Sequence, residues 1–448
     1  MKLRDEPVLV VGTKRSGMGA IELLLKQGAR VRAMDAQPPS PEQQAKFDAM
    51  GVPVMPQSSA NTGDAKLIVL SPAVPWDLPM LIEARRRGVP VIGEVELASR
   101  FLEGPVIGIT GSNGKTTTTA LIGHLLKECG ISHQIGGNIG TAVTSLVETS
   151  KPGQWIVLEL SSFQLEAIQQ FRAKIAACLN VTPDHLDRHH TFEGYAAAKA
   201  RLFENQQMDD FAILNYDDAT CRKYGAQAKA QVFWFSSSQR VPAGIWLEGE
   251  TLRFGEPAFM MRHQIKLRGR HNVENVMAAA LAAHLVGAKL TQIAEAIQTF
   301  PGVEHRIEFV RELNGVEYYN DSKATNVDAT LKAIDAFAGG LWIILGGKNK
   351  GASYAPLAGP LREKAKAVLV IGAEPPYPYS AAPSIRNALS ESVPVIDCGE
   401  LERAVTYARK SARPGDVVLL APACASFDQF ESYEHRGRAF KQIVEQLS

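Results

Sequence analysis

The segment from Val106 to Thr117 restricts the fold of this 448-residue chain more than any other. A β-branched run ends in Gly111-Ser112-Asn113-Gly114-Lys115-Thr116-Thr117, and a helical pattern follows directly. Such glycines let backbone N–H groups approach an anion, the helix N-terminus adds positive potential, and Lys115 supplies a mobile charge. Thr116 is placed to offer its hydroxyl to a nucleotide-bound Mg²⁺. Although Ile109 replaces the first glycine of the standard phosphate-binding loop, the flanking strand and helix favour a phosphate site.

Composition excludes several classes of protein. The formal net charge is +1 and no basic cluster occurs, so we expect no nucleic-acid partner. The five cysteines are scattered without a C-x-x-C pair, which indicates buried thiols in a reducing compartment and neither disulfides nor a zinc site. The charged opening Met1–Glu6 does not resemble a signal peptide, and no apolar run reaches membrane-spanning length. We therefore expect a cytoplasmic protein with no membrane partner.

Strand-like and helix-like segments alternate along the whole chain, which predicts the α/β class with parallel sheets. We expect three domains, over residues 1–96, 97–300 and 301–448, with Phe300-Pro301-Gly302 as the second boundary. Within the central domain, the segments 244–247 and 251–254 predict a surface hairpin. The predicted strands are 8–11, 30–34, 67–70, 106–110, 155–160, 341–345, 367–371, 393–396 and 417–420.

A second glycine-rich loop, Gly12 to Gly19, follows the first predicted strand. Asp35 ends the next strand, where dinucleotide folds place the acid that binds a ribose. Lys14 replaces the second glycine of the G-x-G-x-x-G pattern, so the loop also fits an ordinary strand-to-helix turn. Because nothing downstream suggests hydride chemistry, we favour a nucleotide-diphosphate site over a nicotinamide site.

Two further strand ends in the central domain carry groups that suit a metal or a proton transfer. Glu159 lies near the end of a buried strand, where it would hold Mg²⁺ or, alternatively, cap a helix or stay solvated. His185 follows another strand end and would reach a second metal or orient a nucleophile, whereas His189 and His190 suit structural roles.

Lys199 falls on the apolar stripe of a predicted helix that begins near Thr191. The periodicity favours a lysine whose stem covers apolar surface while its ammonium reaches water. The alternative is a partly desolvated lysine with a lowered pKa, open to covalent modification.

Three strand ends in the third domain bear lysines, hydroxyls and glycines. Together these loops predict a cup for a small anionic ligand, although each alone would suit an ordinary βα turn. The loops are Tyr318–Asn326, Gly346–Gly351 and Ala421–Ser426.

The chain resembles the Mur ligase family, and within it the branch that adds D-glutamate. The resemblance covers almost the whole chain. It is carried by the motifs Gly111–Thr117, Leu158–Leu165, Asn180–Asp187, Gly269–Asn275, Glu304–Arg306, Asn320–Asn326 and Ala423–Phe430. It implies a Rossmann-like N-terminal domain for the UDP substrate, a P-loop-type central ATPase domain and a Rossmann-like C-terminal domain for the amino acid.

The resemblance also implies residue roles. ATP would contact the Gly111–Thr117 turn and Asn275, Arg306 and Asp321. Two Mg²⁺ ions would be held, one by Thr116 and Glu159 and the other by His185 and a carbamylated Lys199. The implied catalytic residues are Lys115, His185 and Lys199. UDP-N-acetylmuramoyl-L-alanine would contact Ser16, Asp35, Ser71, Asn138, Ser161 and Gln164, and D-glutamate would contact Lys323, Thr325, Lys350, Ser426 and the backbone near Tyr433.

Departures from the family pattern affect the uridine contacts most. Lys14 interrupts the first loop, Ala73 follows Ser71-Pro72 where relatives often have glycine, and Tyr433 stands where phenylalanine is expected. The implied chemistry is ATP-dependent activation of a carboxylate as an acyl phosphate, in peptidoglycan precursor synthesis. We also expect a monomer whose C-terminal domain closes on ATP.

Three other functions compete with this one. A sibling ligase for another amino acid or for folate would turn over a different substrate. A nicotinamide-dependent oxidoreductase would bind NADH but leaves the Lys115 loop unexplained. A catalytically silent nucleotide-binding protein would not need Lys115, Glu159, His185 and Lys199 together.

Overall fold

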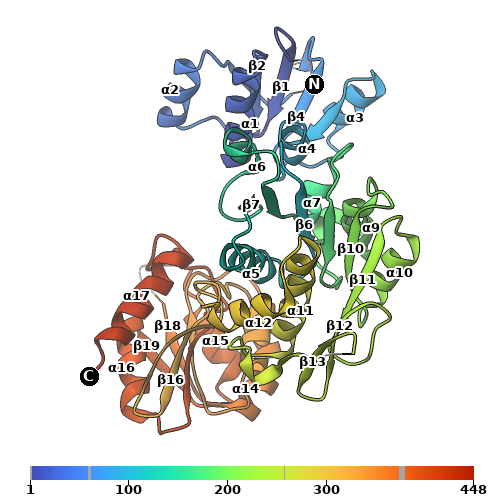
Figure 1. Cartoon of the computed structure of the whole chain (residues 1–448). Coiled ribbons are helices and arrows are strands. Elements are labelled where there is room, and N and C mark those ends of the chain that lie inside the picture. The colour runs from blue at the N-terminus through green and yellow to red at the C-terminus, as the bar shows by residue number, and fades with distance from the viewer. Residues whose placement is uncertain (1–2, 59–61, 257, 373–378) are drawn as a thin grey trace. The chain divides into compact units, whose positions relative to one another are not determined.

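A computed structural model describes residues 3–58, 62–256, 258–372 and 379–448 of the chain (Figure 1). The chain divides into two compact units, one formed by residues up to Lys266 with His271–Phe300, the other by Leu267–Arg270 with Pro301–Ser448. The first unit holds two sheets and the second holds one. This architecture confirms the predicted α/β class.

The first sheet is entirely parallel, in the order β3-β2-β1-β4-β5. Val8–Val11 are buried on both faces, as expected for the central strand of a sheet covered by helices. The chain reverses its direction of travel across the sheet between β1 and β4, and ligands of such sheets bind at that switch point. The elements are β1 (Pro7–Val11), α1 (Arg15–Lys26), β2 (Arg30–Asp35), α2 (Pro41–Ala49), β3 (Val54–Pro56), β4 (Leu67–Leu70), α3 (Pro79–Arg86), β5 (Val91–Gly93) and α4 (Glu94–Ser99).

The second sheet has nine strands in the order β14-β13-β12-β11-β10-β9-β6-β8-β7. Its strands are β6 (Val106–Thr110), β7 (His133–Gly137), β8 (Trp155–Glu159), β9 (Ile175–Cys178), β10 (Phe211–Asn215), β11 (Gln231–Ser236), β12 (Gly244–Glu248), β13 (Thr251–Phe254) and β14 (Ala258–Met261). Its helices are α5 (Lys115–Glu128), α6 (Val143–Leu146), α7 (Ser162–Leu165), α8 (Leu186–His189), α9 (Phe192–Ala200), α10 (Ala219–Gln227), α11 (Arg270–Leu285) and α12 (Leu290–Thr299), with 3₁₀ turns η2 (Val147–Thr149), η3 (Arg201–Phe203) and η4 (Arg262–Gln264).

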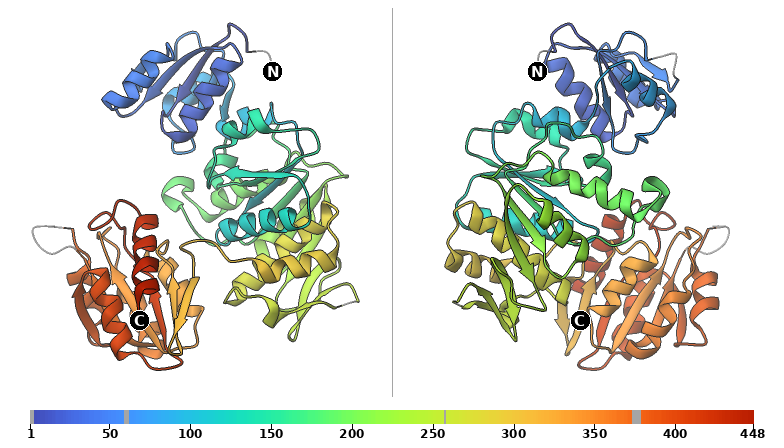
Figure 2. Two further views of the ribbon diagram at one scale, coloured as in Figure 1. Left: turned by 60° about the vertical axis from the view of Figure 1, so that its left-hand side comes forward. Right: turned by 90° about the vertical axis from the view of Figure 1, so that its right-hand side faces the viewer.

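The second unit contains a six-stranded sheet in the order β15-β16-β20-β17-β18-β19, with only β15 antiparallel. Helices cover both of its faces (Figure 2), and each face has its own buried apolar cluster. The elements are β15 (Glu308–Leu313), β16 (Val316–Asn320), α13 (Val327–Asp335), β17 (Leu341–Gly346), η5 (Ala355–Leu357), α14 (Ala358–Lys364), β18 (Ala365–Ile371), α15 (Ala382–Leu389), β19 (Val395–Gly399), α16 (Leu401–Ser411), β20 (Val417–Leu420) and α17 (Tyr433–Gln446).

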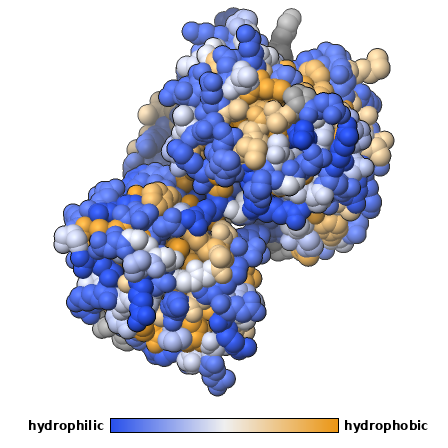
Figure 3. Space-filling model, turned by 60° about the horizontal axis from the view of Figure 1, so that its bottom comes forward, coloured by the Kyte–Doolittle hydropathy of each residue, from blue (hydrophilic) through white to orange (hydrophobic). Residues whose placement is uncertain are grey.

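Helix α16 illustrates how the pattern of apolar residues fixes the packing. Its buried residues recur at helical spacing, so one stripe faces the sheet while the other side stays polar. They are Leu401, Ala404, Val405 and Ala408. On the face drawn in Figure 3, hydrophilic side chains predominate between smaller groups of hydrophobic ones.

Most predicted elements are present, and the differences concern short segments. The hairpin is confirmed, since β12 and β13 pair antiparallel, but β12 also continues the nine-stranded sheet beside β11. Helix α2 and the strands β3, β5, β7, β10, β11, β14 and β15 were not among the predicted elements. Within the described ranges, none of the helices combines the length and the hydrophobicity that crossing a lipid bilayer requires.

Candidate active site

The turn between β6 and α5 is shaped to receive an anion. Gly111 and Gly114 have φ angles of +148° and +85°, a region that glycine enters without steric cost. A Cβ atom on Gly114 would lie 2.2 Å from Oδ1 of Asn275, so no side chain fits there. Lys115 begins the helix, and its Nζ donates to the carbonyl oxygens of Gly111 and Ser112 at 2.8 and 3.1 Å. This geometry supports the phosphate site that the sequence predicts.

The loop after β9 braces this turn from one side. The backbone N–H of Asn113 donates to Oδ1 of Asn180 at 2.8 Å, and the amide of Asn180 donates back to the Asn113 carbonyl at 3.2 Å. The Ser112 hydroxyl donates to the Thr182 carbonyl and accepts from the Thr182 N–H, both at 2.9 Å. The turn is therefore held rigidly before any ligand arrives.

Asn275 supports the turn from the other side. Its Oδ1 accepts from the Thr118 hydroxyl at 3.3 Å, and its Nδ2 donates to Asn272 at 3.0 Å. This side chain is 3% exposed. The structure therefore places Asn275 beside the phosphate turn, as a packing partner of Gly114.

Glu159 lies at the end of β8, next to β6, with Ile109 opposite it in the register. Its carboxylate is 2% exposed, so it is not a solvated surface acid. Oε1 accepts from the Asn138 amide at 3.0 Å, whereas Oε2 is buried without a hydrogen-bond partner among the described residues. A buried carboxylate oxygen without a donor is costly unless a cation or a water satisfies it.

These groups fit a magnesium ion better than a closed metal cage. The described residues contain no cluster of three or more His, Cys, Asp or Glu side chains able to hold a metal. Mg²⁺ is usually held by one or two carboxylates together with phosphate oxygens and water. Glu159 and the partly exposed Thr116 match that pattern beside the phosphate turn.

Lys199 on α9 is buried, and the prediction that its ammonium reaches water is wrong. The residue is 1% exposed, and its Nζ donates to the Gly111 carbonyl at 2.8 Å. The Nζ also lies 4.6 Å from the centre of the Tyr195 ring. Burial, with a smaller contribution from the charge of Lys115, lowers the pKa of Lys199 to about 7. The helix stripe turns inward toward the phosphate turn, so the lysine stem has no route to solvent.

His185 and Lys199 both lie beside the ring of Tyr195. The His185 ring packs at 4.8 Å from Phe163 and at 6.4 Å from Tyr195, which also contacts Lys199. About half of the His185 side chain is exposed, at 48%. His189, in contrast, is buried between Ser162 and Glu166, in the structural role that the sequence suggests.

Two residues predicted to face the UDP-sugar form a capping box instead of free side chains. The Ser161 hydroxyl accepts from the Gln164 N–H at 3.3 Å, and Oε1 of Gln164 accepts from the Ser161 N–H at 3.0 Å. Gln164 is 4% exposed. Ser161 and Asn138 are only partly buried and are therefore better placed for contact with a ligand.

The first glycine-rich loop is explained by close packing. A Cβ atom on Gly17 would lie 1.7 Å from the Gly12 carbonyl, and one on Gly19 would lie 2.4 Å from the Thr144 hydroxyl. Lys14 is exposed at the N-cap of α1, where no glycine is required. The missing glycine therefore does not prevent the loop from forming at the switch point.

Asp35 and Ser71 both lie beside this loop. Oδ2 of Asp35 accepts from the N–H and the hydroxyl of Thr13, each at 2.7 Å. Burial opposes ionisation of Asp35, but the bonds from Thr13 and from the backbone of Gln37 and Ala36 together outweigh it and hold the pKa of that carboxyl below its usual value. The Ser71 hydroxyl donates to the Gly12 carbonyl at 3.0 Å, and Ser16 lies in the first turn of α1. The structure thus brings Ser16, Asp35 and Ser71 to one edge of the sheet.

In the second unit, three loops meet at the carboxyl ends of the neighbouring strands β16, β20 and β17. We call residues 321–326, 347–351 and 421–427 the amino-acid cup. Lys350 donates to the Thr325 carbonyl at 3.2 Å, and Nζ of Lys323 lies 5.9 Å from the centre of the Tyr433 ring. Ser426 is 2% exposed, at the end of the third loop. All five residues predicted to bind the amino acid therefore lie on or beside the cup.

Asp321 is the first residue of the cup, and the charge of Arg306 acts on it. The Ile307 N–H donates to Oδ1 of Asp321 at 3.3 Å, and Asp321 is 6% exposed. Burial raises the pKa of Asp321 to about 7, although the charges of Arg306 and Lys323 act in the opposite direction.

Arg436 is a structural member of this site that the sequence did not reveal. Its guanidinium, 1% exposed, donates to the Ser322 carbonyl at 2.9 Å, to the Ser322 hydroxyl at 3.0 Å and to the Cys424 carbonyl at 3.2 Å. It thereby ties two loops of the cup to α17. Helical periodicity would have detected it only as one charged residue on the inner side of α17.

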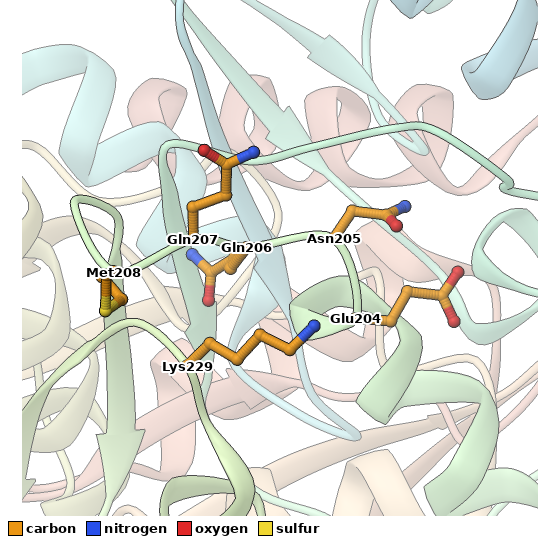
Figure 4. A pocket seen from close by; sticks show the side chains of 6 residues that line it. All are labelled: Glu204, Asn205, Gln206, Gln207, Met208 and Lys229. Carbon is orange, nitrogen blue, oxygen red and sulfur yellow. The ribbon is translucent and has the colours of Figure 1, made fainter.

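One hollow on the first unit is lined by none of these residues. It has a volume of about 760 Å³ and is lined by residues 204–208 and Lys229 (Figure 4). The amide of Gln206, one of these residues, donates to the Ala173 and Phe211 carbonyls at 3.1 and 2.9 Å. None of its lining residues was predicted to bind a substrate.

Comparison with known proteins yields three matching family models. They are the MurD-like N-terminal domain of Mur ligases over residues 6–93, the Mur ligase middle domain over 109–283, and the Mur ligase glutamate ligase domain over 305–424. Two relatives named UDP-N-acetylmuramoylalanine–D-glutamate ligase come from Solibacter usitatus and Koribacter versatilis. They are 56% and 48% identical over all of this chain and 99% of their own length.

Solved structures of two enzymes from Thermotoga maritima share the fold. The UDP-N-acetylmuramate–alanine ligase MurC is 19% identical with a TM-score of 0.59, and covers 98% of this chain and 99% of its own. The MurF ligase in complex with ADP is 20% identical with a TM-score of 0.60, and covers 99% of this chain and 96% of its own.

Proposed function

The chain belongs to the Mur ligase family, and on that premise we propose that it is an ATP-dependent ligase which joins D-glutamate to UDP-N-acetylmuramoyl-L-alanine. The observation that carries this proposal is the full-length identity to relatives named for that reaction. A phosphate-binding turn in one unit and a lysine-bearing cup in the other supply the chemistry that such a reaction requires.

We assign one substrate to each predicted domain. The switch point of residues 1–96, with Ser16, Asp35 and Ser71, takes the uridine end of the nucleotide sugar. Residues 97–300 bind ATP and the sugar end, the latter through Asn138, Ser161 and Gln164. Residues 301–448 bind D-glutamate through Lys323, Thr325, Lys350, Ser426 and the backbone at Tyr433, and Arg306 and Asp321 contact the adenosine of ATP.

The first step activates a carboxylate, which is a poor electrophile. Oxygen of the L-alanyl carboxylate attacks the γ-phosphorus of ATP, the bond to the β-phosphate oxygen breaks, and an acyl phosphate and ADP form. Lys115 and the backbone N–H groups of its turn stabilise the charge on the transferred phosphoryl group. Thr116 and Glu159 would hold the Mg²⁺ that supplies additional charge neutralisation.

The second step forms the amide. The neutral amine of D-glutamate attacks the acyl carbon, a tetrahedral intermediate expels inorganic phosphate, and the amine loses one proton. His185 would hold a second Mg²⁺ and would then have no free lone pair for that proton, so the expelled inorganic phosphate accepts it. Lysines and hydroxyls in the cup bind the two carboxylates while leaving the amine free.

We also propose that Lys199 carries a carbamate. A buried lysine with a pKa of about 7 is largely neutral at physiological pH, and a neutral amine adds to CO₂ with loss of one proton. The carbamate oxygens would give Lys199 and His185 a way to hold a second Mg²⁺, which an ammonium group cannot do. Because its substrates include ATP, we place the reaction in the cytoplasm.

The test is phosphate release measured with all three substrates and with each one omitted in turn. Sustained release only in the complete mixture supports the ligase. A panel of amino acids then tests specificity, because turnover with L-lysine or diaminopimelate but not D-glutamate would identify a sibling ligase.

Lys115→Ala should reduce turnover at least about 100-fold, as expected when a transition-state charge partner is removed. Lys127→Ala is the matched control, because Lys127 is exposed at the far end of the same helix. Full activity in Lys115→Ala would refute the catalytic assignment.

A further inference from the structure

Lys348 lies in the second loop of the amino-acid cup, two residues before Lys350. Its backbone N–H donates to the Ala425 carbonyl at 2.8 Å, directly before Ser426. On its other side Lys348 forms a β-bridge with Ser380. The loop after β17 is therefore held between two backbone segments at the edge of the cup.

The side chain of Lys348 lies against an aromatic ring. Its Nζ is 5.6 Å from the centre of the Tyr379 ring, and Tyr379 is 59% exposed. Within the described part of the chain, no carboxylate forms an ion pair with Lys348. Elsewhere in the same unit, Lys441 is paired with Glu304 and Glu308. The Tyr379 ring thus stabilises the ammonium of Lys348 by a cation–π contact, and the ammonium can still bind an anion.

The surroundings of Lys348 carry an excess of positive charge. Lys350 donates to a backbone carbonyl, and Arg436 donates to carbonyls and a hydroxyl. Asp321 does not fully offset these charges near neutral pH, because burial raises its pKa to about 7. The carboxylate of Asp428 offsets part of the charge of Arg436, but among the described residues neither Lys348 nor Lys350 forms an ion pair with a carboxylate. Ammonium groups in such a setting favour an anionic ligand.

We propose that Lys348 is a further specificity-determining residue, whose ammonium binds the side-chain carboxylate of the incoming amino acid while Tyr379 positions it. The inference rests on the proposed function, which makes the ligand of the cup a dicarboxylic amino acid. It adds a third lysine to Lys323 and Lys350, from the loop that lies beside Ser426. Three ammonium groups suit two carboxylates, since each carboxylate can then accept from more than one charged donor.

The consequence is selection by charge. A glutamate side chain gains a charge-assisted hydrogen bond from Lys348, whereas the neutral amide of glutamine gains far less. Loss of the ammonium should therefore weaken the binding of D-glutamate about tenfold and change the binding of D-glutamine little.

The experiment compares Lys348→Met with the unchanged protein. We expect the KM for D-glutamate to rise about tenfold, with kcat and the KM for ATP within about twofold. The inhibition constant of D-glutamine should stay within about twofold, so the preference for the acid over the amide falls. Lys348→Arg, which keeps the charge, should retain most of the preference.

Matched variants distinguish the effect of losing the Lys348 charge from a general effect on the structure. Lys366→Met removes an exposed lysine of β18 and should change neither constant. Tyr379→Leu should raise the KM for D-glutamate less than Lys348→Met does, and Tyr379→Phe should not.

An unchanged KM for D-glutamate in Lys348→Met, or an equal loss of D-glutamate and D-glutamine, would overturn the inference. If the unchanged protein itself fails to use D-glutamate, the proposed function fails instead.

Discussion

At the scale of single residues, burial gives several side chains a chemistry that their type alone does not suggest. Lys199 is almost inaccessible to water and lies near Lys115, so its charged form is disfavoured. Periodicity alone placed this lysine on an apolar stripe and favoured a stem reaching out to solvent, whereas the family resemblance implied a carbamylated lysine. Periodicity identifies the face of a helix, and it does not report whether that face ends at the surface or below another element.

The lowered pKa of Lys199 predicts a dependence on both CO₂ and pH. Below pH 7 the amine becomes an ammonium group that cannot add to CO₂, so carbamate and activity should both fall as the pH drops through about 7. Initial rates in CO₂-depleted buffer at pH 6.5 should be several-fold lower, and added bicarbonate should restore them. Equal rates with and without bicarbonate would contradict the carbamate.

Asp321 shows the reverse shift and leads to a second prediction. Its raised pKa, about 7, means that a carboxylate able to accept bonds from the ribose hydroxyls of ATP forms as the pH rises through neutrality. The KM for ATP should therefore fall severalfold between pH 6 and pH 8. In Asp321→Asn this dependence should largely disappear, leaving only the change caused by ionisation of ATP itself. An unaltered pH profile in the variant would exclude Asp321 from the nucleotide site.

At the scale of elements, α4 shows how one carboxylate can fasten a helix. Glu96 is fully buried and accepts from the backbone N–H groups of Gln169, Gln170 and Phe171 at 2.8, 3.0 and 2.9 Å. Arg100, one turn later, donates to the same carboxylate at 2.9 Å. The connection between the first two sheets is therefore anchored to the loop after α7.

Glu96→Ala should destabilise the first unit by about 3 kcal/mol, because one buried N–H group, two partly buried N–H groups and one guanidinium lose their charged partner. Urea unfolding followed by circular dichroism measures the change. Glu22→Ala, at an exposed position of α1, serves as control and should shift stability by less than about 0.5 kcal/mol. A shift of similar size in both variants would contradict the anchoring role.

Long periodic elements and strand ends were predictable from the sequence, whereas short or irregular elements were not. The strand of Leu67–Leu70 and the helix that follows Gly114 have patterns that few other structures would satisfy. Strand β3 has three residues, including a proline, and carries too little pattern to detect. Strand β15 alternates only weakly between buried and exposed positions and pairs with β16 across a bulge.

The candidate site was predictable in its parts but not in its support. Glycines, lysines and hydroxyl residues at strand ends predicted the phosphate turn and the cup. The contacts that hold them, such as Arg436 on Ser322 and Asn275 against Gly114, join segments more than 100 positions apart. No local pattern can report such pairs, because they depend on the tertiary fold.

At the scale of the whole molecule, the chain consists of two units with separate hydrophobic cores. One unit contains the clusters around the first two sheets, and the other contains the clusters on both faces of the six-stranded sheet. Units with their own cores usually unfold as separate cooperative steps.

Calorimetry should therefore resolve two unfolding transitions. Gly17→Ala should lower only the transition temperature of the first unit, because the Cβ atom of the alanine would lie 1.7 Å from the Gly12 carbonyl. A Cβ atom at Gly359, in α14, would have no neighbour within 4 Å. Gly359→Ala should therefore leave both transition temperatures unchanged or slightly raise that of the second unit. A single transition that Gly17→Ala shifts as a whole would contradict the division.

The hairpin of β12 and β13, next to the edge strand β14 of the nine-stranded sheet, offers a site for engineering. Strand β13 lies five strand spacings from β6 in the sheet order, or roughly 24 Å at about 4.8 Å per spacing. Gly249, at the tip of the turn between β12 and β13, has nothing within 4 Å of where a side chain would begin. A short epitope or a fluorescent label grafted there would report on the protein in living cells without crowding the nucleotide.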